Sequence, residues 1–482
     1  MYHRLKSRVV KYLFIVCFGS HRSMRKSAFG QRHVQVVLIF FGLVLAYAMR
    51  VNMSLAIVAM TDPHAGGNSC SAEYCKAYVN QTFNWSVGTR SVILSSFFWG
   101  YVVLQVPGGE LANRVGGKLL LASSIAINSI LLMAIPTCAY YGGWQLVVVC
   151  RVLQGLFQGV TFPSVHNLLG KWVPVEEKSR LGQFVYAGSQ LGTALQLITA
   201  GYIADQWGWP MIFYSVGILG AIWTLFYLKL GAASPQSSNT ISPDERGYIE
   251  SSLGTVQVHK KLQTPWKAIM TSKQFLALVL VHCGQNWGFW TLLTEIPSYM
   301  ELVLKVNIKS NGVLSALPYL MMFILSFVFS IILEHCHNKQ LFSLSTSRKI
   351  SNSIGFYGAA AALIGIVYAP SHSLTASVAL LAIAVGVNAG HITGLVLVHI
   401  DMAPNFAGSL MGVTNGLANI VSIVAPLVAA IILKDESDPK FWKVVFFLAA
   451  AVYVLTNTIF IIFGTSERQP WNDPSDEYKP LS

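Results

Sequence analysis

Long apolar segments separated by short polar ones run through most of this chain. A helix that crosses the hydrocarbon core of a bilayer needs about 20 mostly apolar residues, whereas a membrane β-barrel would show short alternating segments. Gly and Pro within several segments are compatible with membrane helices, because neighbouring helices and local waters satisfy the freed backbone groups. The pattern predicts an all-α polytopic membrane protein with twelve transmembrane helices, at roughly 34–60, 91–111, 119–139, 144–169, 181–203, 210–231, 274–300, 312–333, 353–369, 374–399, 408–433 and 441–464.

One long polar stretch divides these segments into six and six. It is rich in Ser, Pro and charge, and a weak repeat supports the division, since Pro174 and Pro404 follow the fourth and the tenth segment and a Gly stands eight residues after each. Two six-helix halves related by an axis along the membrane normal, with a substrate site between them, are a known transporter layout. The predicted organisation is a basic N-terminus (1–33), a first half (34–231), a central cytoplasmic loop (232–273), a second half (274–464) and a cytoplasmic tail (465–482).

Composition excludes a soluble protein and explains the excess of positive charge. Hydrophobic residues make up 54% of the 482 residues and charged ones only 11%, against about 25% charged residues in a soluble globular chain. The net charge of +13 comes from Lys and Arg before the first span and in alternate loops. By the positive-inside rule, this asymmetry predicts that both termini are cytoplasmic. We therefore expect the lipid bilayer as a partner, but neither nucleic acid nor an obligate protein partner.

The longest loop predicted on the outer side spans residues 61–90 and carries candidate sites for glycosylation. Asn80 and Asn84 each begin an acceptor sequence for N-glycosylation. Cys70 and Cys75 lie in the same loop and either pair as a disulfide or remain free thiols. The other cysteines are scattered along the chain, and we expect neither a metal site nor a bound cofactor apart from the coupling ion.

Two arginines fall inside predicted spans, where a charged side chain is costly. Arg50 lies in the first span and Arg151 in the fourth, at comparable depth in the outer half of the bilayer on the predicted topology. Placing Arg at the bilayer centre costs at least about 2.5–3.5 kcal/mol on insertion scales. A guanidinium keeps its charge and pairs bidentately with carboxylate or phosphate. Because the sequence offers no carboxylate near either arginine, we expect an anionic ligand as the missing partner; the alternative is that each binds backbone carbonyls and ties helices together.

The fourth predicted helix carries a polar stripe. Arg151, Gln154 and Gln158 are spaced i, i+3 and i+7 and therefore share one face. His166 returns to roughly the same side near the cytoplasmic end, and Pro163 is expected to bend the helix. A polar stripe on an otherwise apolar helix is typical of a cavity wall. His166 either relays protons or acts only as a hydrogen-bonding group.

A set of motifs spread over the chain forms a joint pattern: Met49–Ser54, Gln105–Gly109, Gly155–His166, Lys171–Pro174, Asn286–Pro297 and Ala403–Asn415. Together they resemble the anion/cation symporter group of the major facilitator superfamily, which includes sialin, the vesicular glutamate transporters and the sodium-dependent phosphate cotransporters. The resemblance covers about residues 34–464 and implies the major facilitator fold. It also implies that Arg50 and Arg151 bind the substrate anion and that His166 lies at the polar end of the cavity.

The sequence departs from the proton-coupled members of that group. Where they carry acidic residues in the fourth helix, this chain has Gln154 and Gln158, which cannot take up a proton. We therefore favour sodium over the proton as the coupling ion, with proton-coupled or potential-driven transport as alternatives. The asparagines among the candidates either bind sodium or only pin helix contacts. The candidate coupling residues are His166, Asn52, Asn415, Asn419 and Glu295.

The predicted function is secondary active transport of small anions, either inorganic phosphate or an organic anion, by alternating access. No catalytic residues are expected, because the spans hold no paired carboxylates, no nucleophile–base group and no His-x-x-x-His zinc spacing. A receptor that retains a transporter shell is the competing interpretation. The target is either the plasma membrane or an endolysosomal or vesicular membrane. The candidate substrate-binding residues are Arg50, Arg151, Gln154, Gln158, His166 and Asn286.

Overall fold

The computed structural model describes residues 30–61, 82–253, 264–299, 303–304, 308–369, 373–433 and 438–472, and these ranges contain helices and no strand. Each of the twelve predicted spans coincides with a helix, with part of a helix or with a helix broken into pieces. The predicted sites at Asn80, Cys70 and Cys75 lie outside the described residues.

The first half of the chain contains one helix that supplies two predicted spans. Helix α6 turns back on itself at Gly143, whose backbone is non-helical (φ 59°, ψ −157°). The fourth span then breaks at Gly159 and Val160, one helical turn before Pro163. Proline has no N–H to donate to the carbonyl four residues earlier, so it cannot continue the helical hydrogen bonding across this point. The predicted bend at Pro163 is thus a break just before it. The helices are α2 (Gln31–Thr61), α4 (Val87–Val103), α5 (Gln105–Val115), α6 (Gly117–Gln158), α7 (Thr161–Trp172), α8 (Lys178–Trp207) and α9 (Pro210–Leu230).

The second half contains a span that is irregular in its middle. The tenth predicted span consists of α15, a π-helical turn η4 and the short helix α16. Single π turns inside helices are frequent at functional sites. The elements are α12 (Lys273–Ser298), α13 (Ile308–Asn338), α14 (Leu344–Tyr368), α15 (Leu374–Val387), η4 (Ile392–Val396), α16 (Val398–Met402), α17 (Ala407–Ile432) and α18 (Pro439–Phe463).

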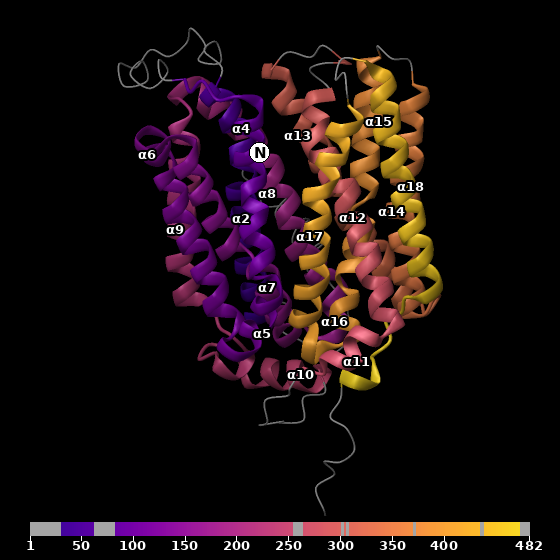
Figure 1. Cartoon of the computed structure of the whole chain (residues 1–482). Coiled ribbons are helices and arrows are strands. Elements are labelled where there is room, and N and C mark those ends of the chain that lie inside the picture. Colours follow the sequence, from indigo (N-terminus) through magenta and orange to yellow (C-terminus); the bar gives the residue numbers. More distant parts are fainter. Residues whose placement is uncertain are drawn as a thin grey trace, which may run out of the picture.

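The two groups of helices stand next to each other in one bundle (Figure 1). Two clusters of buried apolar side chains follow the same division, one drawn mainly from α2 to α9 and the other mainly from α12 to α18. The predicted domain boundaries stay a prediction. Between the two groups, α10 (Pro243–Leu253) and α11 (Trp266–Thr271) lie across the lower end of the bundle in Figure 1, which we call the α10 end.

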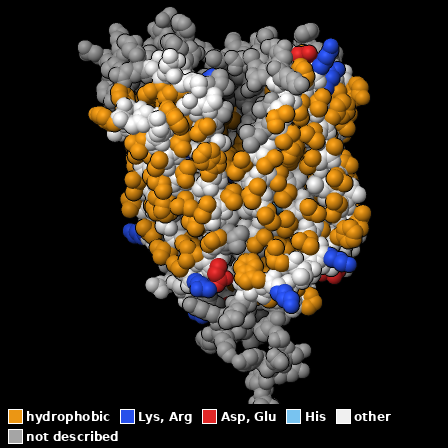
Figure 2. All heavy atoms as spheres, in the orientation of Figure 1, with side chains coloured by type: hydrophobic (Ala, Val, Ile, Leu, Met, Phe, Trp, Pro, Cys, Tyr) orange, Lys and Arg blue, Asp and Glu red, His pale blue; other side chains and the backbone are white. Residues whose placement is uncertain are grey.

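The outer surface of the bundle is suited to lipid. Figure 2 shows apolar side chains spread over the middle of the molecule, with Lys, Arg, Asp and Glu near its upper and lower margins. Large apolar side chains such as Ile218, Leu225, Leu455 and Ile462 are exposed there. Eight of the described helices are long and apolar enough to cross a membrane, or nine if the bent pair α4 and α5 counts as one span. One of the eight, Gly117–Trp172, contains two predicted spans.

A buried ion network holds α10 against the first half. Arg32 Nε lies 2.8 Å from Glu177 Oε2, and its Nη1 lies 2.9 Å from Glu245 Oε1 on α10. Burial alone would raise the pKa of the Glu177 carboxyl, but its hydrogen bond to Arg32 and the charge of Arg32 outweigh burial and hold that pKa below its ordinary value. The stabilisation is therefore present at neutral pH and is lost only as the pH falls through this lowered pKa.

Candidate functional site

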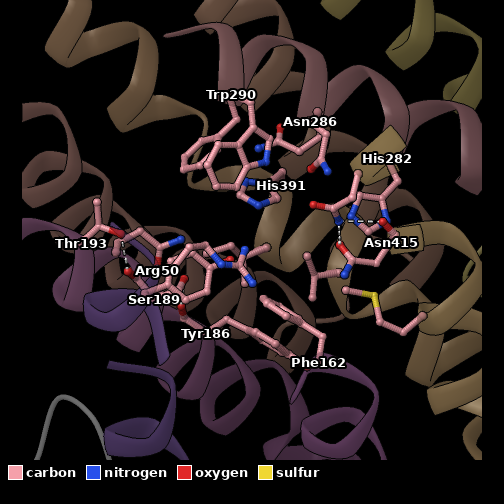
Figure 3. Close-up of a pocket in the computed structure, with 18 of the residues that line it drawn as sticks. Arg50, Phe162, Tyr186, Ser189, Thr193, His282, Asn286, Trp290, His391 and Asn415 are labelled. Atoms are coloured by element: carbon pink, nitrogen blue, oxygen red, sulfur yellow. Dashed lines mark hydrogen bonds between the residues drawn. The ribbon is translucent and has the colours of Figure 1, made fainter. Parts of the chain in front are cut away.

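A cavity of about 680 Å³, including its part open to solvent, lies between the two halves. Helices α2, α4, α7 and α8 line it on one side, and α12, α17 and the segment around η4 line it on the other. Figure 3 shows Arg50 and Ser189 facing this space on one side, His282 and Asn415 on the other, and Trp290 between them. The lining combines one guanidinium with side-chain hydroxyls and amides, which are hydrogen-bond donors suited to a small anion.

Arg50 is the cation of the cavity wall. Its Nε donates to Gln158 Oε1 at 3.0 Å, and aromatic rings surround its guanidinium. Its two terminal nitrogens have no acceptor among the described residues, although the side chain is only 6% exposed. A half-satisfied guanidinium at a cavity wall offers two parallel donors to an oxyanion. The Arg50 Cζ lies 4.4, 4.8, 5.0 and 6.0 Å from the ring centres of Tyr101, Tyr47, Phe97 and Trp290, respectively.

Arg151 lies behind Arg50 and is not among the residues that line the cavity. Its Nη1 donates to Gln154 Oε1 at 3.3 Å and its Nη2 to the Arg50 carbonyl at 3.4 Å, while its Nε has no partner. The sequence predicted a comparable depth for the two arginines; the structure brings them together but presents only Arg50 of the two to the cavity. In this conformation Arg151 holds the backbone of α2 in place.

The two glutamines of the polar stripe are tied to the arginines. Gln158 accepts from Arg50 and donates through Nε2 to the Ala46 carbonyl at 2.8 Å. Gln154 accepts from Arg151, and its own Nε2 has no partner. Both side chains are almost fully buried. Gln158 therefore fixes the orientation of Arg50 without neutralising its charge.

His166 lies beneath the cavity, not in its wall. The Tyr186 hydroxyl is 2.6 Å from His166 Nδ1, and Tyr186 itself lines the cavity. The other ring nitrogen lies 3.4 Å from the Val396 carbonyl in η4, in the second half of the chain. His166 therefore joins the two halves directly below the cavity.

Of the four asparagines proposed as candidates from the sequence, three line the cavity and one does not. Asn286, Asn415 and Asn419 line the cavity, where Asn286 donates to Ser422 Oγ at 3.1 Å and Asn415 to Gln105 Oε1 at 2.8 Å. Asn419 donates to the Asn415 carbonyl at 2.7 Å. Asn52 is fully buried, does not line the cavity and has no hydrogen-bond partner for its side chain. The backbone of Glu295 lies in α12, and its side chain is not described.

Several cavity residues were not among the sequence candidates. Helix α8 contributes Tyr186, Ser189, Gln190 and Thr193. Their spacing of three, four and seven residues places them on one helix face, and this spacing was the signal that could have identified them. The aromatic residues around Arg50 carried no such signal, because aromatic side chains are common in any membrane helix.

The two halves are in direct contact between the cavity and the α10 end. A Cβ on Gly109 of α5 would lie 2.6 Å from the Gly408 carbonyl at the start of α17, so these backbones touch. Asp401 of α16 pairs with Arg348 of α14 at 2.9 Å and with Lys178 of α8 at 3.5 Å. These pairs are almost fully buried, and the second one crosses from one half to the other. The contacts close the α10 end in this conformation.

Comparison with known proteins decides the family. Residues 38–426 match the Major Facilitator Superfamily. The chain belongs to this superfamily. A Drosophila melanogaster protein described as "Putative inorganic phosphate cotransporter" is 40% identical over 481 residues, which cover 95% of this chain and 90% of that protein. Human Sialin is 36% identical over 452 residues, covering 91% and 90% of the two chains. Human Vesicular glutamate transporter 2 is 34% identical over 469 residues, covering 95% and 77%.

These comparisons confirm the predicted anion/cation symporter group of the major facilitator superfamily and its all-α membrane fold. The chain is a transporter of the superfamily's anion group and not an enzyme. Its partners are accordingly a membrane and a small anion.

Proposed function

We propose that this major facilitator chain carries inorganic phosphate or a closely similar small oxyanion across the membrane by alternating access, with Arg50 as the residue that binds the anion. The observation that carries the proposal is the Arg50 guanidinium, which lines the cavity and has two terminal nitrogens without an acceptor in the described part of the chain. An anion supplies both the missing acceptors and the missing negative charge. Asn286 and the α8 hydroxyls are the further contacts that we expect.

Phosphate is favoured over organic anions on two grounds. The relative described as "Putative inorganic phosphate cotransporter" is 40% identical to this chain, whereas the human glutamate transporter and Sialin are 34% and 36% identical. The described cavity wall also contains one Arg and no Lys. One guanidinium fork is sufficient for a phosphate, which is a compact oxyanion.

Sodium coupling stays a prediction. The amide groups of Asn415 and Asn419 lie at the cavity, in favour of a sodium site, but Asn52 lies away from it. No acidic side chain lines the cavity among the described residues, so a sodium ion there would be bound by neutral oxygens alone.

The test is transport by purified protein in liposomes. Labelled phosphate, glutamate, sialic acid and an aryl carboxylate are each offered against the same unlabelled anion inside, with sodium, pH and voltage gradients imposed separately. We expect saturable exchange of phosphate. A monodisperse protein that exchanges none of these anions would contradict the proposal and favour the receptor interpretation, and equal uptake with and without a sodium gradient would remove sodium coupling.

We also propose that both termini lie in the cytoplasm and that Asn84 carries a glycan. Asn84 is exposed immediately before α4, at the end of the bundle opposite the α10 end. Glycan transfer to this site requires that end to face the secretory lumen. We expect glycosidase treatment to shift the mobility of the wild-type protein on a gel, and the double variant Asn80→Gln, Asn84→Gln to migrate at the shifted position without treatment. A wild-type protein that the glycosidase leaves unchanged would contradict the glycan.

A further inference from the structure

A group of histidines gathers at the cavity and directly beneath it. His166 of α7, His282 of α12 and His399 of α16 are buried, and His391, just before η4, is half-buried. His282 and His391 line the cavity with Arg50, and Figure 3 shows them facing the same space. Four histidines from four segments of both halves thus meet at the place where the halves separate in alternating access.

A hydroxyl joins two of these rings. Thr414 Oγ1 of α17 lies 3.1 Å from His282 Nδ1 and 2.7 Å from His399 Nε2. The His399 ring centre lies 5.8 Å from those of both His282 and His166. Tyr186, whose hydroxyl bonds to His166, lines the cavity on the other side. The row His282, Thr414, His399, His166 and Tyr186, which we call the histidine row, therefore runs from one cavity wall to the other through the buried interface.

The chemistry of this row suits a proton. A hydroxyl donates one hydrogen bond and accepts two, and histidine is the side chain whose ordinary titration falls nearest to physiological pH. When His282 takes up a proton from the cavity, its Nδ1–H can pass to Thr414 Oγ1 while the Thr414 hydroxyl proton passes to His399 Nε2. The hydroxyl is restored, one positive charge moves from His282 to His399, and no other bond changes.

We infer that the histidine row is a proton-binding site that couples proton uptake to anion transport, in place of the fourth-span carboxylates for which this chain has Gln154 and Gln158. The inference rests on the proposed function and assigns the proton, instead of sodium, as the coupling ion. The physical link is charge. Arg50 lies in the same cavity, so a protonated histidine and Arg50 repel each other until an anion binds between the two sides.

The surroundings of the row support this link. Tyr186 of α8 faces the row directly, and the cavity that the row adjoins is also lined by Arg50, Tyr47 and Tyr101. Asp401 lies close to His399 in the sequence, but its carboxylate is already paired with Arg348 and Lys178. No acidic side chain of the described residues pairs with any of the four histidines. A proton here has no permanent counter-charge, so its binding depends on the anion. By reciprocity, the bound proton must favour the anion by the same factor.

The row also gives a route for release. His166 belongs to the first half and His399 to the second, so opening of the α10 end pulls their rings apart. The positive charge on the His399 ring then gains access to water on that side. Proton uptake from the cavity and release at the α10 end would accompany each anion in the same direction.

The experiment uses labelled inorganic phosphate and full-length protein in liposomes, with two readouts for each variant. The first readout is uptake driven by an inward proton gradient, and the second is exchange of phosphate at equal pH on both sides. His399→Gln removes a ring from the row, and Thr414→Val removes the bridging hydroxyl at almost constant volume. We expect both variants to lose gradient-driven uptake at least ~10-fold, within the ~5–150-fold that couplings between two sites typically span, while exchange at saturating phosphate on both sides stays within about threefold.

Controls separate this inference from a folding defect and from the proposed function. Thr414→Ser keeps the hydroxyl and should retain gradient-driven uptake, as should His335→Gln, which makes the same change at an exposed histidine of α13. Unchanged gradient-driven uptake in both row variants would overturn the inference, and so would wild-type uptake that responds to a sodium gradient alone. Absence of phosphate exchange in the wild-type protein would instead overturn the proposed function.

Discussion

Replacing Arg50 with Gln is expected to lower the apparent affinity for the transported anion roughly 10–150-fold. The substitution removes the two terminal donors that face the cavity, together with the charge of the cavity wall. The amide of the introduced Gln can still donate one hydrogen bond, so the expected net loss is that of about one bond to a charged group, about 1.5–3 kcal/mol, and about 1.4 kcal/mol corresponds to a tenfold change in affinity. The measurement is the concentration dependence of phosphate exchange in liposomes.

Two further variants test whether the fork geometry or only the charge of Arg50 matters. Arg50→Lys keeps the charge but not the parallel donors, so its affinity should lie between those of the wild type and Arg50→Gln. Arg246→Gln makes the matched change at an exposed arginine of α10 that pairs with Glu250, and exchange should be unaffected. Arg50→Gln with wild-type affinity would show that the anion binds elsewhere.

The sequence alone could single out Arg50, because placing a charged side chain in an apolar membrane helix costs a large free energy. An uncompensated guanidinium within a span requires either a ligand or a protein partner, and nearby sequence offered no carboxylate. The same reasoning placed Arg151 at a comparable depth but could not decide which of the two faces the cavity. That outcome depends on how closely α2 approaches α6, where the Arg50 carbonyl meets the Arg151 guanidinium.

Contacts across the two halves could not be read from helix spacing. Periodicity places His166 and His399 within their own helices, but it does not say that their rings meet 5.8 Å apart. The pairing of Lys178 with Asp401 is of the same kind, since each lies near the end of a different helix and each alone resembles an ordinary surface charge. Asn52 shows that the sequence can also propose a residue that the cavity does not contain. It was as good a candidate as Asn415 and Asn419, but it lies on a face of its helix that is turned away from the cavity.

Gln158→Glu should make transport depend on acid. Gln158 Oε1 accepts the Arg50 Nε–H at 3.0 Å, so a carboxylate at this position would lie against the guanidinium and compensate its charge. The transported anion would then compete with a permanent neighbour, and exchange at neutral pH should fall at least ~10-fold, as expected when a charge-assisted bond of about 1.5–3 kcal/mol must be displaced. As the pH is lowered and the carboxyl is protonated, it becomes neutral like the native amide, and exchange should recover.

The measurement is phosphate exchange at equal internal and external pH, stepped from about 7.5 to about 3.5, a range that extends below the ordinary glutamate pKa of about 4.3. Gln158→Met removes the acceptor without adding charge and should show no recovery in acid beyond that of the wild type. Gln154→Glu places the carboxylate against Arg151, which does not line the cavity, so it should inhibit less. If Gln158→Glu exchanges phosphate normally at neutral pH, the charge of Arg50 is not what binds the anion. If the amide is instead essential only for orienting Arg50, Gln158→Met and Gln158→Glu should fail alike at every pH, and the electrostatic account of the site would have to be abandoned.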